Sequence, residues 1–334
     1  MFDLKIKAII DRTLGESKKV SDEYLYYCPF CHFEKKPKLS VSFTKNKWKC
    51  WICLKSGTQF LYLIKKFGKQ EDLKEYISFF TPNSSDCIWT ILYPDSHKQE
   101  DFDPVCTIPK DYEFIYYCNS NASRRALNYL IKDRGLTEKN IYDFRIGFCE
   151  SGEYRNRFII PSFNETGSCN YFIAQLPENK CQYKWLYPKI EKSLIIFNEL
   201  NIDWTKPIYI VEGGIDAIKI SNFTMNVVPL IGKTISLSEN GYSKLLEKLL
   251  LFRPEIYLCL DADVEKGEII NRSVQVANLL LEYGLPSTII NPYPYKDFGA
   301  IPIQQINDFL KHQSKIESTS DLLIQKIEEF RLNL

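Results

Sequence analysis

Hydrophobic and polar positions near the start of the chain predict a small α+β unit. The segments KLSVSF (38–43) and KWKC (47–50) alternate well enough for two short strands joined by a hairpin turn. Apolar residues then recur at helical spacing over 57–68, and a second short helix follows over 71–80. The next segment, 81–109, contains four prolines, is locally acidic and has weak periodicity, which is typical of a linker.

The remainder of the chain has a different pattern. A capped helix from about Ser123 to Gly135 and a second helix from near Thr137 precede a β-hairpin over 157–175. From residue 206 onward strands and helices alternate, which predicts a largely parallel sheet. The expected strands are 208–212, 226–229, 255–260 and 287–291, and the expected helices are 215–222, 236–251 and 268–282.

The composition is that of a globular protein with about two domains of ordinary size. The chain has 334 residues, of which 45% are hydrophobic, and it contains no run of ~18 apolar residues that would predict a membrane span. Its first residues do not resemble a signal peptide, so we expect a cytoplasmic location. Of eleven cysteines only Cys28, Cys31, Cys50 and Cys53 are regularly spaced, which favours reduced thiols over a disulfide framework.

The net charge of +1 hides a basic N-terminal region. Residues 1–80 carry 16 Lys and Arg against nine Asp and Glu, a net charge of +7, whereas residues 81–109 carry one against five, a net charge of −4. A local cluster of cations attracts phosphate even when the whole chain is close to neutral. The distribution therefore favours a module that binds a polyanion and is joined to the rest by a tether.

The regularly spaced cysteines form two CxxC pairs separated by eighteen residues, a pattern that predicts a zinc ribbon. Each pair forms a knuckle, and the hairpin between them brings four thiolates into a tetrahedron; His32 is a lower-ranked alternative to its neighbour Cys31. Lysine and aromatic residues surround the knuckles, and this combination suits the phosphates and unpaired bases of single-stranded nucleic acid. We expect Trp48 and Lys49 near the binding face.

Acidic residues follow two of the predicted strands. Glu212 ends one strand and is followed by two glycines and a helix that carries Asp216 in its first turn. Asp261 and Asp263 end another strand, where residues two apart point the same way. In an open α/β sheet ligands bind at this edge, and clustered carboxylates suit Mg²⁺ or Mn²⁺.

Other motifs complete or limit this assignment. Lys296 and Asp297 lie just beyond the last predicted strand as a phosphate contact and a further acidic group, and Asp308 competes with Asp297 for the latter role. The segment LIGKTIS resembles the end of a P-loop, but Val227 stands where that motif requires glycine, which excludes an ATPase motor of this type. None of the three histidines lies in a nucleophile context.

The zinc knuckle, the Glu-Gly-x-x-Asp turn and the Asp-x-Asp strand end occur in the order seen in bacterial-type DNA primases, including the shorter phage enzymes that lack a fused helicase. CPF, EKKPKLSV and WKCWICLKSGTQFLYLI resemble the zinc-binding domain of that family, although its second ligand is often histidine and is Cys31 here. ALNYLIKDRGLTEKNIYDFRIGF and RNRFIIPSFNETGSCNYFI resemble the first parts of the primase polymerase domain, and the segment from Glu212 to Asp297 resembles its TOPRIM subdomain.

The resemblance implies an α+β zinc ribbon followed by an α/β TOPRIM-containing primase polymerase domain. It implies a template-binding ribbon at 1–80, a linker at 81–109, a basic subdomain at 110–205, a TOPRIM catalytic subdomain at 206–300 and a helical tail at 301–334. It also implies one structural Zn²⁺, catalytic Mg²⁺ or Mn²⁺, a single-stranded DNA template, ribonucleoside triphosphates and a replicative helicase on a separate chain.

The same resemblance assigns roles to residues. It implies that Asp261 and Asp263 coordinate metal, with Glu212 as a metal ligand or general base and Asp216 in support. It places cations that meet template or nucleotide phosphates at Arg155, Arg157, Lys184 and Lys296.

Three other classes share parts of this pattern. A type IA topoisomerase needs a nucleophilic tyrosine on a large separate arm, and too few residues follow Asp297 to form one. A TOPRIM nuclease would cleave DNA without nucleotides, and a non-enzymatic recombination mediator would bind DNA without polymerising anything. We expect primer synthesis in preference to all three.

Overall fold

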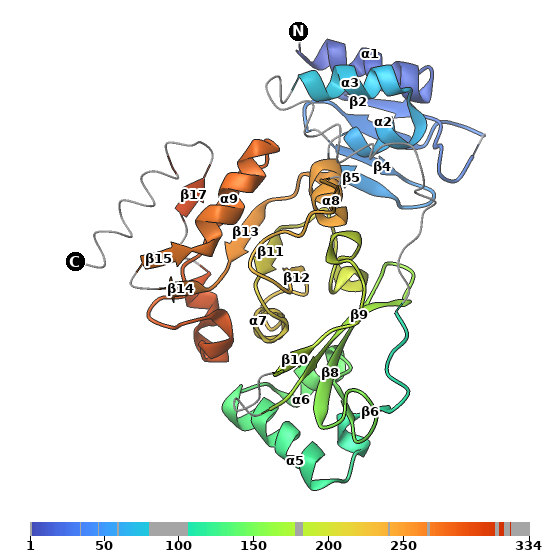
Figure 1. Ribbon diagram of the computed structural model, residues 1–334. Coiled ribbons are helices and arrows are strands. Elements are labelled where there is room, and N and C mark those ends of the chain that lie inside the picture. The colour runs from blue at the N-terminus through green and yellow to red at the C-terminus, as the bar shows by residue number, and fades with distance from the viewer. Residues whose placement is uncertain are drawn as a thin grey trace.

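The computed structural model describes residues 2–79 apart from 34, 46 and 59, residues 106–310 apart from 178–182, 240, 266 and 267, and residues 314–316 and 321. This part of the chain forms an N-terminal unit, a middle unit built on an antiparallel sheet and a last unit built on a mostly parallel sheet (Figure 1). None of the helices in it is long and apolar enough to cross a membrane. The predicted linker and the predicted tail lie mostly outside the described residues.

The N-terminal unit is a five-stranded antiparallel sheet with three helices. Its strands, in sheet order, are β1 (Lys18–Val20), β2 (Glu23–Tyr26), β3 (Leu39–Ser42), β4 (Lys47–Cys50) and β5 (Ser56–Thr58). The helices are α1 (Phe2–Leu14), α2 (Leu61–Phe67) and α3 (Gln70–Ser78), and they share one apolar core with the sheet. Helix α1 was not predicted from the sequence, although Ile6, Ile9 and Ile10 recur at helical spacing and are buried.

The middle unit contains the predicted hairpin at its centre. Its sheet runs in the order β10 (Trp185–Leu186), β9 (Cys169–Gln175), β8 (Arg157–Phe163), β7 (Gly147–Cys149) and β6 (Tyr112–Phe114). Helix α5 (Asn121–Asn128) begins after Ser120, whose hydroxyl accepts the Ser123 N–H, so the helix starts before the predicted Ser123. It continues as a π-helical turn (Tyr129–Asp133), and α6 (Glu138–Asp143) follows the predicted cap Thr137.

The last unit has the predicted alternation of strands and helices. Its sheet runs in the order β12 (Val227–Pro229), β11 (Ile208–Val211), β13 (Ile256–Cys259), β16 (Ser287–Ile289) and β17 (Ser314–Ile316), and only the pairing of β16 with β17 is antiparallel. Its helices are α7 (Gly214–Ile220), α8 (Lys244–Phe252), α9 (Arg272–Glu282) and α10 (Ile306–Phe309). Val211 pairs with Pro229 on one side and Cys259 on the other, so β12, β11 and β13 end at the same edge.

Three predicted elements of this unit were wrong in type or extent. The first four residues of the predicted helix 268–282 form β15 (Glu268–Asn271), which pairs with β14 (Ala262–Glu265) as a hairpin. The predicted helix 236–251 begins only at α8, because Ser243 caps it by accepting the Leu246 N–H. The predicted helical tail contains β17, which adds an antiparallel strand to the edge of the sheet.

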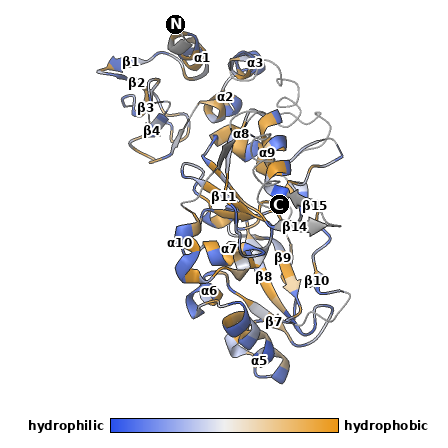
Figure 2. Cartoon of the chain, turned by 90° about the vertical axis from the view of Figure 1, so that its left-hand side faces the viewer, coloured by the Kyte–Doolittle hydropathy of each residue, from blue (hydrophilic) through white to orange (hydrophobic). Residues whose placement is uncertain are grey.

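The N-terminal unit packs against α8 of the last unit. The ring of Tyr62 on α2 stacks on Phe252 with 5.3 Å between centroids, and Lys65 forms an ion pair with Glu247. Buried residues of α2 and α8 belong to one hydrophobic cluster that reaches the parallel sheet, and Figure 2 shows apolar residues on α8 and β11. The N-terminal unit is therefore joined to the last unit by apolar packing as well as by the polypeptide chain.

Candidate active site and metal centre

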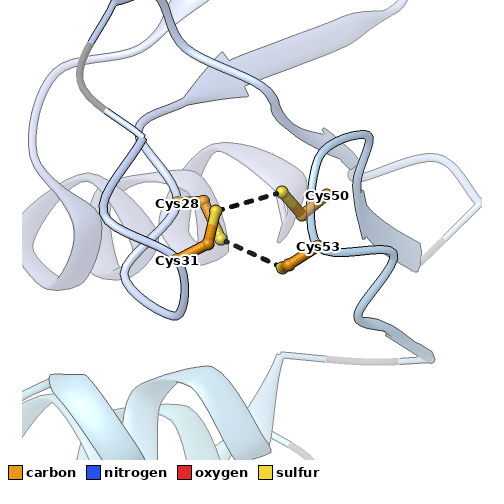
Figure 3. Close-up of side chains that lie close together, drawn as sticks. All are labelled: Cys28, Cys31, Cys50 and Cys53. Carbon is orange, nitrogen blue, oxygen red and sulfur yellow. Dashed lines mark hydrogen bonds between the residues drawn. The ribbon is translucent and has the colours of Figure 1, made fainter.

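Four cysteines from two loops of the N-terminal unit converge, as Figure 3 shows. Their Sγ atoms all lie within 4.8 Å of one another, and the Sγ atoms of Cys28 and Cys53, and of Cys31 and Cys50, are 3.8 Å apart. A disulfide would require about 2.05 Å, so these are free thiols. Zn–S bonds of about 2.3 Å place the corners of a tetrahedron about 3.8 Å apart, so the geometry fits one metal ion held by four thiolates.

The backbone of the knuckles supports this arrangement. The His32 N–H donates to the Cys28 carbonyl at 3.1 Å, and the Ile52 N–H points to the Cys50 sulfur at 3.4 Å. The first bond closes the tight turn, and the second places the partial positive charge of an N–H group beside a sulfur that must be ionised to bind metal. The structure brings Cys31, and not the alternative His32, into the four-residue group.

The solvent-exposed face of the zinc ribbon carries a different aromatic residue from the one predicted. Along β4 exposed and buried residues alternate, so Lys47 and Lys49 face solvent while Trp48 and Cys50 face the core. Trp48 is only 3% exposed and stacks on Phe30, so its assignment to the binding face was wrong. The exposed ring beside Lys49 is that of Trp51, which lies 4.8 Å from the lysine Nζ.

Two of the predicted acidic residues leave neighbouring strands at one edge of the parallel sheet. Glu212 follows β11 directly, and Asp261 lies two residues beyond the end of β13. Because Val211 pairs with Cys259 in parallel register, both half-buried residues reach the carboxyl edge side by side. Asp263 was predicted to extend β13. It belongs instead to the β14–β15 hairpin, and its side chain lies outside the described part of the chain.

Asp216 connects the two loops that carry Glu212 and Asp297. It is 8% exposed; its Oδ2 accepts the Gly213 N–H at 3.0 Å and its Oδ1 accepts the Gly299 N–H at 2.7 Å. A Cβ atom on Gly299 would lie 2.8 Å from Asp216 Oδ1 and 3.2 Å from Asp297 Oδ1, so only glycine permits this close approach. The structure therefore places Asp216 as a positioning residue between the loops.

The second acidic loop places Asp297 beside this buried carboxylate. Burial, and then the charge of Asp297, raise the pKa of Asp216 to about 7, while the N–H groups of Gly299 and Gly213 and the charge of Arg134 act in the opposite direction. Asp297 Oδ1 is buried and accepts no hydrogen bond from the described residues, as expected of an oxygen available to a cation. Asp308 is exposed on α10, so Asp297 is the better placed of the two candidates.

The raised pKa of Asp216 gives a testable dependence of stability on pH. The folded protein holds the proton up to about pH 7 and the unfolded chain releases it near pH 4, so this group contributes stability below pH 4 that is lost as pH rises to 7. We expect the difference in unfolding free energy between the wild type and Asp216→Asn to fall across pH 4–7, measured by denaturant titration. A difference for Asp216→Asn that stays constant across this pH range would contradict this assignment.

Cations from two units gather beside Asp297. Burial, followed by the charges of Arg134 and Lys296, lowers the pKa of Lys184, so the three cations act on one another electrostatically. Arg134 Nε donates to the Tyr129 hydroxyl at 2.7 Å, which fixes the guanidinium. Arg134 and Lys184 come from the middle unit and Lys296 from the last, so the two units together form a positively charged site.

Lys192 and Lys219 lie close to the same edge. Lys192 Nζ donates to the Ile231 carbonyl at 2.6 Å, and the Ile231 N–H donates to the Glu212 carbonyl at 3.0 Å. Ile231 has φ of +53°, a strained value for a β-branched residue, which this lysine helps to hold next to Glu212. Lys219 is 3% exposed on α7, and burial and then Arg134 lower its pKa.

Of these cations, Lys184 and Lys296 were predicted from the sequence, whereas Arg134, Lys192 and Lys219 were not. Arg134 does carry a local signal, because it stands directly before Gly135, whose φ of +63° makes the turn between two helices. The two predicted arginines belong to the middle unit. Arg155 is exposed, and Arg157 Nη2 donates to the Tyr183 carbonyl at 2.8 Å, which ties it to the segment before β10.

Known protein families match the N-terminal unit and the last unit of the chain. The CHC2 zinc finger family matches residues 2–81, and the Toprim domain family matches residues 207–289. The first range contains the four-thiol group, and the second contains Glu212, Asp216, Asp261 and Asp263. The chain thus combines a CHC2 zinc finger with a Toprim domain, which confirms the predicted fold class.

Curated relatives that match about 70% of the chain are DNA primases, which confirms the resemblance seen in the sequence. The DNA primase of Mycoplasma genitalium is 23% identical over 290 residues, covering 70% of this chain and 47% of the relative; that of Clostridium acetobutylicum is 23% identical over 291 residues, covering 74% and 46%. The chain therefore spans about half the length of these curated relatives. The crystal structure of the zinc-binding and RNA polymerase domains of the Aquifex aeolicus primase aligns with a TM-score of 0.45 at 20% identity, over 98% of this chain and 89% of that one.

Proposed function

We propose that this protein is a DNA primase, which synthesises short RNA primers from ribonucleoside triphosphates on a single-stranded DNA template. The observation that carries the proposal is the pairing of Val211 with Cys259, which brings Glu212 and Asp261 to one sheet edge. Lys192 of the middle unit donates to the Ile231 carbonyl, and the Ile231 N–H donates to the Glu212 carbonyl at this edge; a four-thiol centre lies in the same chain. The similarity to bacterial DNA primases supports the same assignment.

Two kinds of metal follow from the donor atoms present. Four clustered thiolates are the ligand set of a structural Zn²⁺. Carboxylates of Glu212, Asp261 and Asp263 are hard oxygen ligands that suit Mg²⁺ or Mn²⁺, and Asp297 Oδ1 offers a further buried acceptor. When bound, such ions lower the pKa of the attacking 3′-hydroxyl and neutralise charge on the departing pyrophosphate.

The chain's own residues perform the positioning. Arg134, Lys184 and Lys296 bind triphosphate or template phosphates, since they approach one another from two units beside the acidic edge. Asp216 fixes the loops of Glu212 and Asp297 through two backbone N–H groups. Electrostatic preorganisation of this kind requires no covalent intermediate on the protein.

The N-terminal unit handles the template in this proposal. Lys47 and Lys49 project from the exposed side of β4, and Trp51 is 57% exposed beside Lys49. A ring for an unpaired base next to cations for the phosphates is the usual composition of a single-strand binding surface. Trp51 replaces Trp48 as the aromatic residue that we place on the template-binding face.

Primer synthesis on defined templates tests the proposal. The purified chain is incubated with short single-stranded DNA templates, the four ribonucleoside triphosphates, one of them radiolabelled, and Mg²⁺ or Mn²⁺. We expect short RNA products whose sequence follows the template. Cleavage of labelled DNA without nucleotides, and no RNA product, would instead assign a Toprim nuclease.

A further inference from the structure

We propose that Lys219 is a positioning residue, which fastens the turn that carries Arg134 to the loop that carries Asp297. In this way it sets the distance between a phosphate-binding cation and the acidic edge. The inference rests on the proposed function, in which Arg134 binds phosphate and Asp297 offers an oxygen to a cation. It gives a role to a lysine that this function leaves without one.

Helix α7, which carries Lys219, lies at the junction of the middle and last units. Ile215 and Ile218 of this helix belong to the apolar cluster of the middle unit. Ala217 and Ile220 belong to a cluster on the parallel sheet of the last unit. Any polar group on α7 that is buried between these clusters is therefore in contact with both units.

The ammonium of Lys219 contacts a backbone segment of each unit. Its Nζ donates to the carbonyl of Ile301, which directly follows the 3-10 turn after Asp297, at 3.4 Å. On the other side, a Cβ atom added to Gly135 would lie 3.2 Å from the same Nζ, so the ammonium packs against the turn after Arg134. One side chain therefore joins the turn of the phosphate-binding arginine to the acidic loop.

The junction has a second connection that does not depend on this lysine. Asn140 on α6 is 1% exposed, and its Nδ2 donates to Asn222 Oδ1 at 3.2 Å and to the Ile218 carbonyl at 3.5 Å. These neutral hydrogen bonds and the apolar clusters hold the middle unit against α7. Cohesion of the two units therefore does not require a charge at position 219.

A charged side chain is a costly choice for this position. Burial, and then the charge of Arg134, lower the pKa of Lys219, whereas the charge of Asp297 acts in the opposite direction. Within the described part of the chain its hydrogen-bond acceptor is a single carbonyl at 3.4 Å, so the buried ammonium is poorly compensated. An apolar side chain of similar length would fill the space without this cost. The charge is therefore better explained by the site than by stability.

Burial also decides between direct binding and positioning. Lys219 is only 3% exposed, so it does not reach a phosphate in solvent and must act through its neighbours. Arg134 is held by its bond to the Tyr129 hydroxyl, and the loop of Asp297 is held by the bond from the Gly299 N–H to Asp216. Lys219 connects these two locally fixed groups, and its loss would let one move relative to the other.

Steady-state primer synthesis by the full metal-loaded chain, at varied ribonucleoside triphosphate, tests the effect on the site. We expect Lys219→Met to raise KM for the nucleotides about 10-fold and to change kcat by less than about twofold. A phosphate contact that is equally strong in the bound and reacting states affects KM alone, which a general loss of folded protein does not. Lys206→Met is the matched control, because Lys206 is exposed just before β11, and it should keep both constants.

Urea unfolding and hydrogen exchange separate positioning from a structural role. The urea midpoint of Lys219→Met should equal or exceed that of the wild type, because the variant removes a poorly compensated buried charge. Amide exchange should become faster in the peptides that cover 129–136 and 297–301 and stay unchanged in β3 and β4 of the N-terminal unit. A lower midpoint or a variant that does not fold would make Lys219 a structural residue and overturn the proposal. Unchanged KM, or unchanged exchange in both peptides, would also overturn it.

The same measurements distinguish this proposal from the proposed function. If the wild type makes primers and Lys219→Met has the wild-type KM, the role of Lys219 is wrong and the primase assignment stands. If the wild type makes no primers, but Lys219→Met exchanges faster in both peptides at an undiminished urea midpoint, the lysine still positions the two segments and the primase assignment fails.

Discussion

Replacing Asp261 and Asp263 together by alanine is expected to lower the rate of RNA synthesis on the order of 10³-fold or more. These residues follow β13 at the edge where Glu212 follows β11, so their loss removes carboxylates that the proposal assigns to a divalent cation. Primer synthesis on a short single-stranded template, with saturating Mg²⁺ or Mn²⁺, measures the effect. The metal content of the thiol centre should not change.

The control for this experiment is Glu255→Gln. Glu255 is exposed and lies immediately before β13, at the amino end of that strand. The substitution therefore removes a charge from the opposite edge of the sheet. We expect it to synthesise primers at nearly the wild-type rate. Full activity of the double alanine variant would show that the acidic edge is not the catalytic site.

Loss of the thiol centre is expected to have the second large effect. Structural zinc contributes on the order of 10–16 kcal/mol in zinc-finger peptides at neutral pH, which exceeds the total stability of most small domains. We therefore expect Cys31→Ser to lose the metal and to unfold the N-terminal sheet, whose core includes Cys28, Cys50 and Trp48. Metal analysis and the near-UV circular dichroism of the tryptophans report these two changes.

His32→Asn is the matched control for Cys31→Ser. His32 is exposed, lies outside the four-thiol group and has φ of +49°, a conformation that asparagine tolerates. We expect this variant to retain one metal ion per chain. If instead His32→Asn releases the metal and Cys31→Ser keeps it, the ligand set derived from the structure is wrong.

Spacing along the chain was enough to predict the thiol centre and the acidic edge. Two CxxC pairs around a hairpin leave few other ways to arrange four thiols, and Cys31 indeed lies with the other three. Glu212 and Asp261 each follow an apolar strand in an alternating α/β pattern, and parallel strands carry such residues to one edge. In both cases local pattern and global fold agree.

The errors arose where a local pattern allowed two answers. Residues 268–271 have two isoleucines that fit a helix or a strand, and pairing with β14 decided for a strand. The abundance of lysine and aromatic residues near Trp48 suggested a binding face, yet Trp48 shares the side of β4 with Cys50, which must face the centre of the ribbon. Residues two apart in a strand face the same side, so the inward position of Cys50 also predicts that Trp48 lies in the core.

The cationic part of the site could not be predicted from local patterns. Arg134 follows a π-helical turn, Lys184 precedes an edge strand and Lys296 follows the last parallel strand, so only the packing of two units brings them together. The role of Asp216 is equally non-local, because one of its two donors, Gly299, lies 83 residues away. The predicted helicase partner stays a prediction.

The central claim is that the carboxyl ends of β11 and β13 form a site for divalent cations. Anomalous diffraction from crystals soaked in Mn²⁺ tests it most directly. The account predicts an anomalous peak in contact with the carboxylates of Glu212 and Asp261, with the side chain of Asp263 directed toward the same ion. Carboxylates that point to separate places, with no peak between them under saturating Mn²⁺, would contradict it.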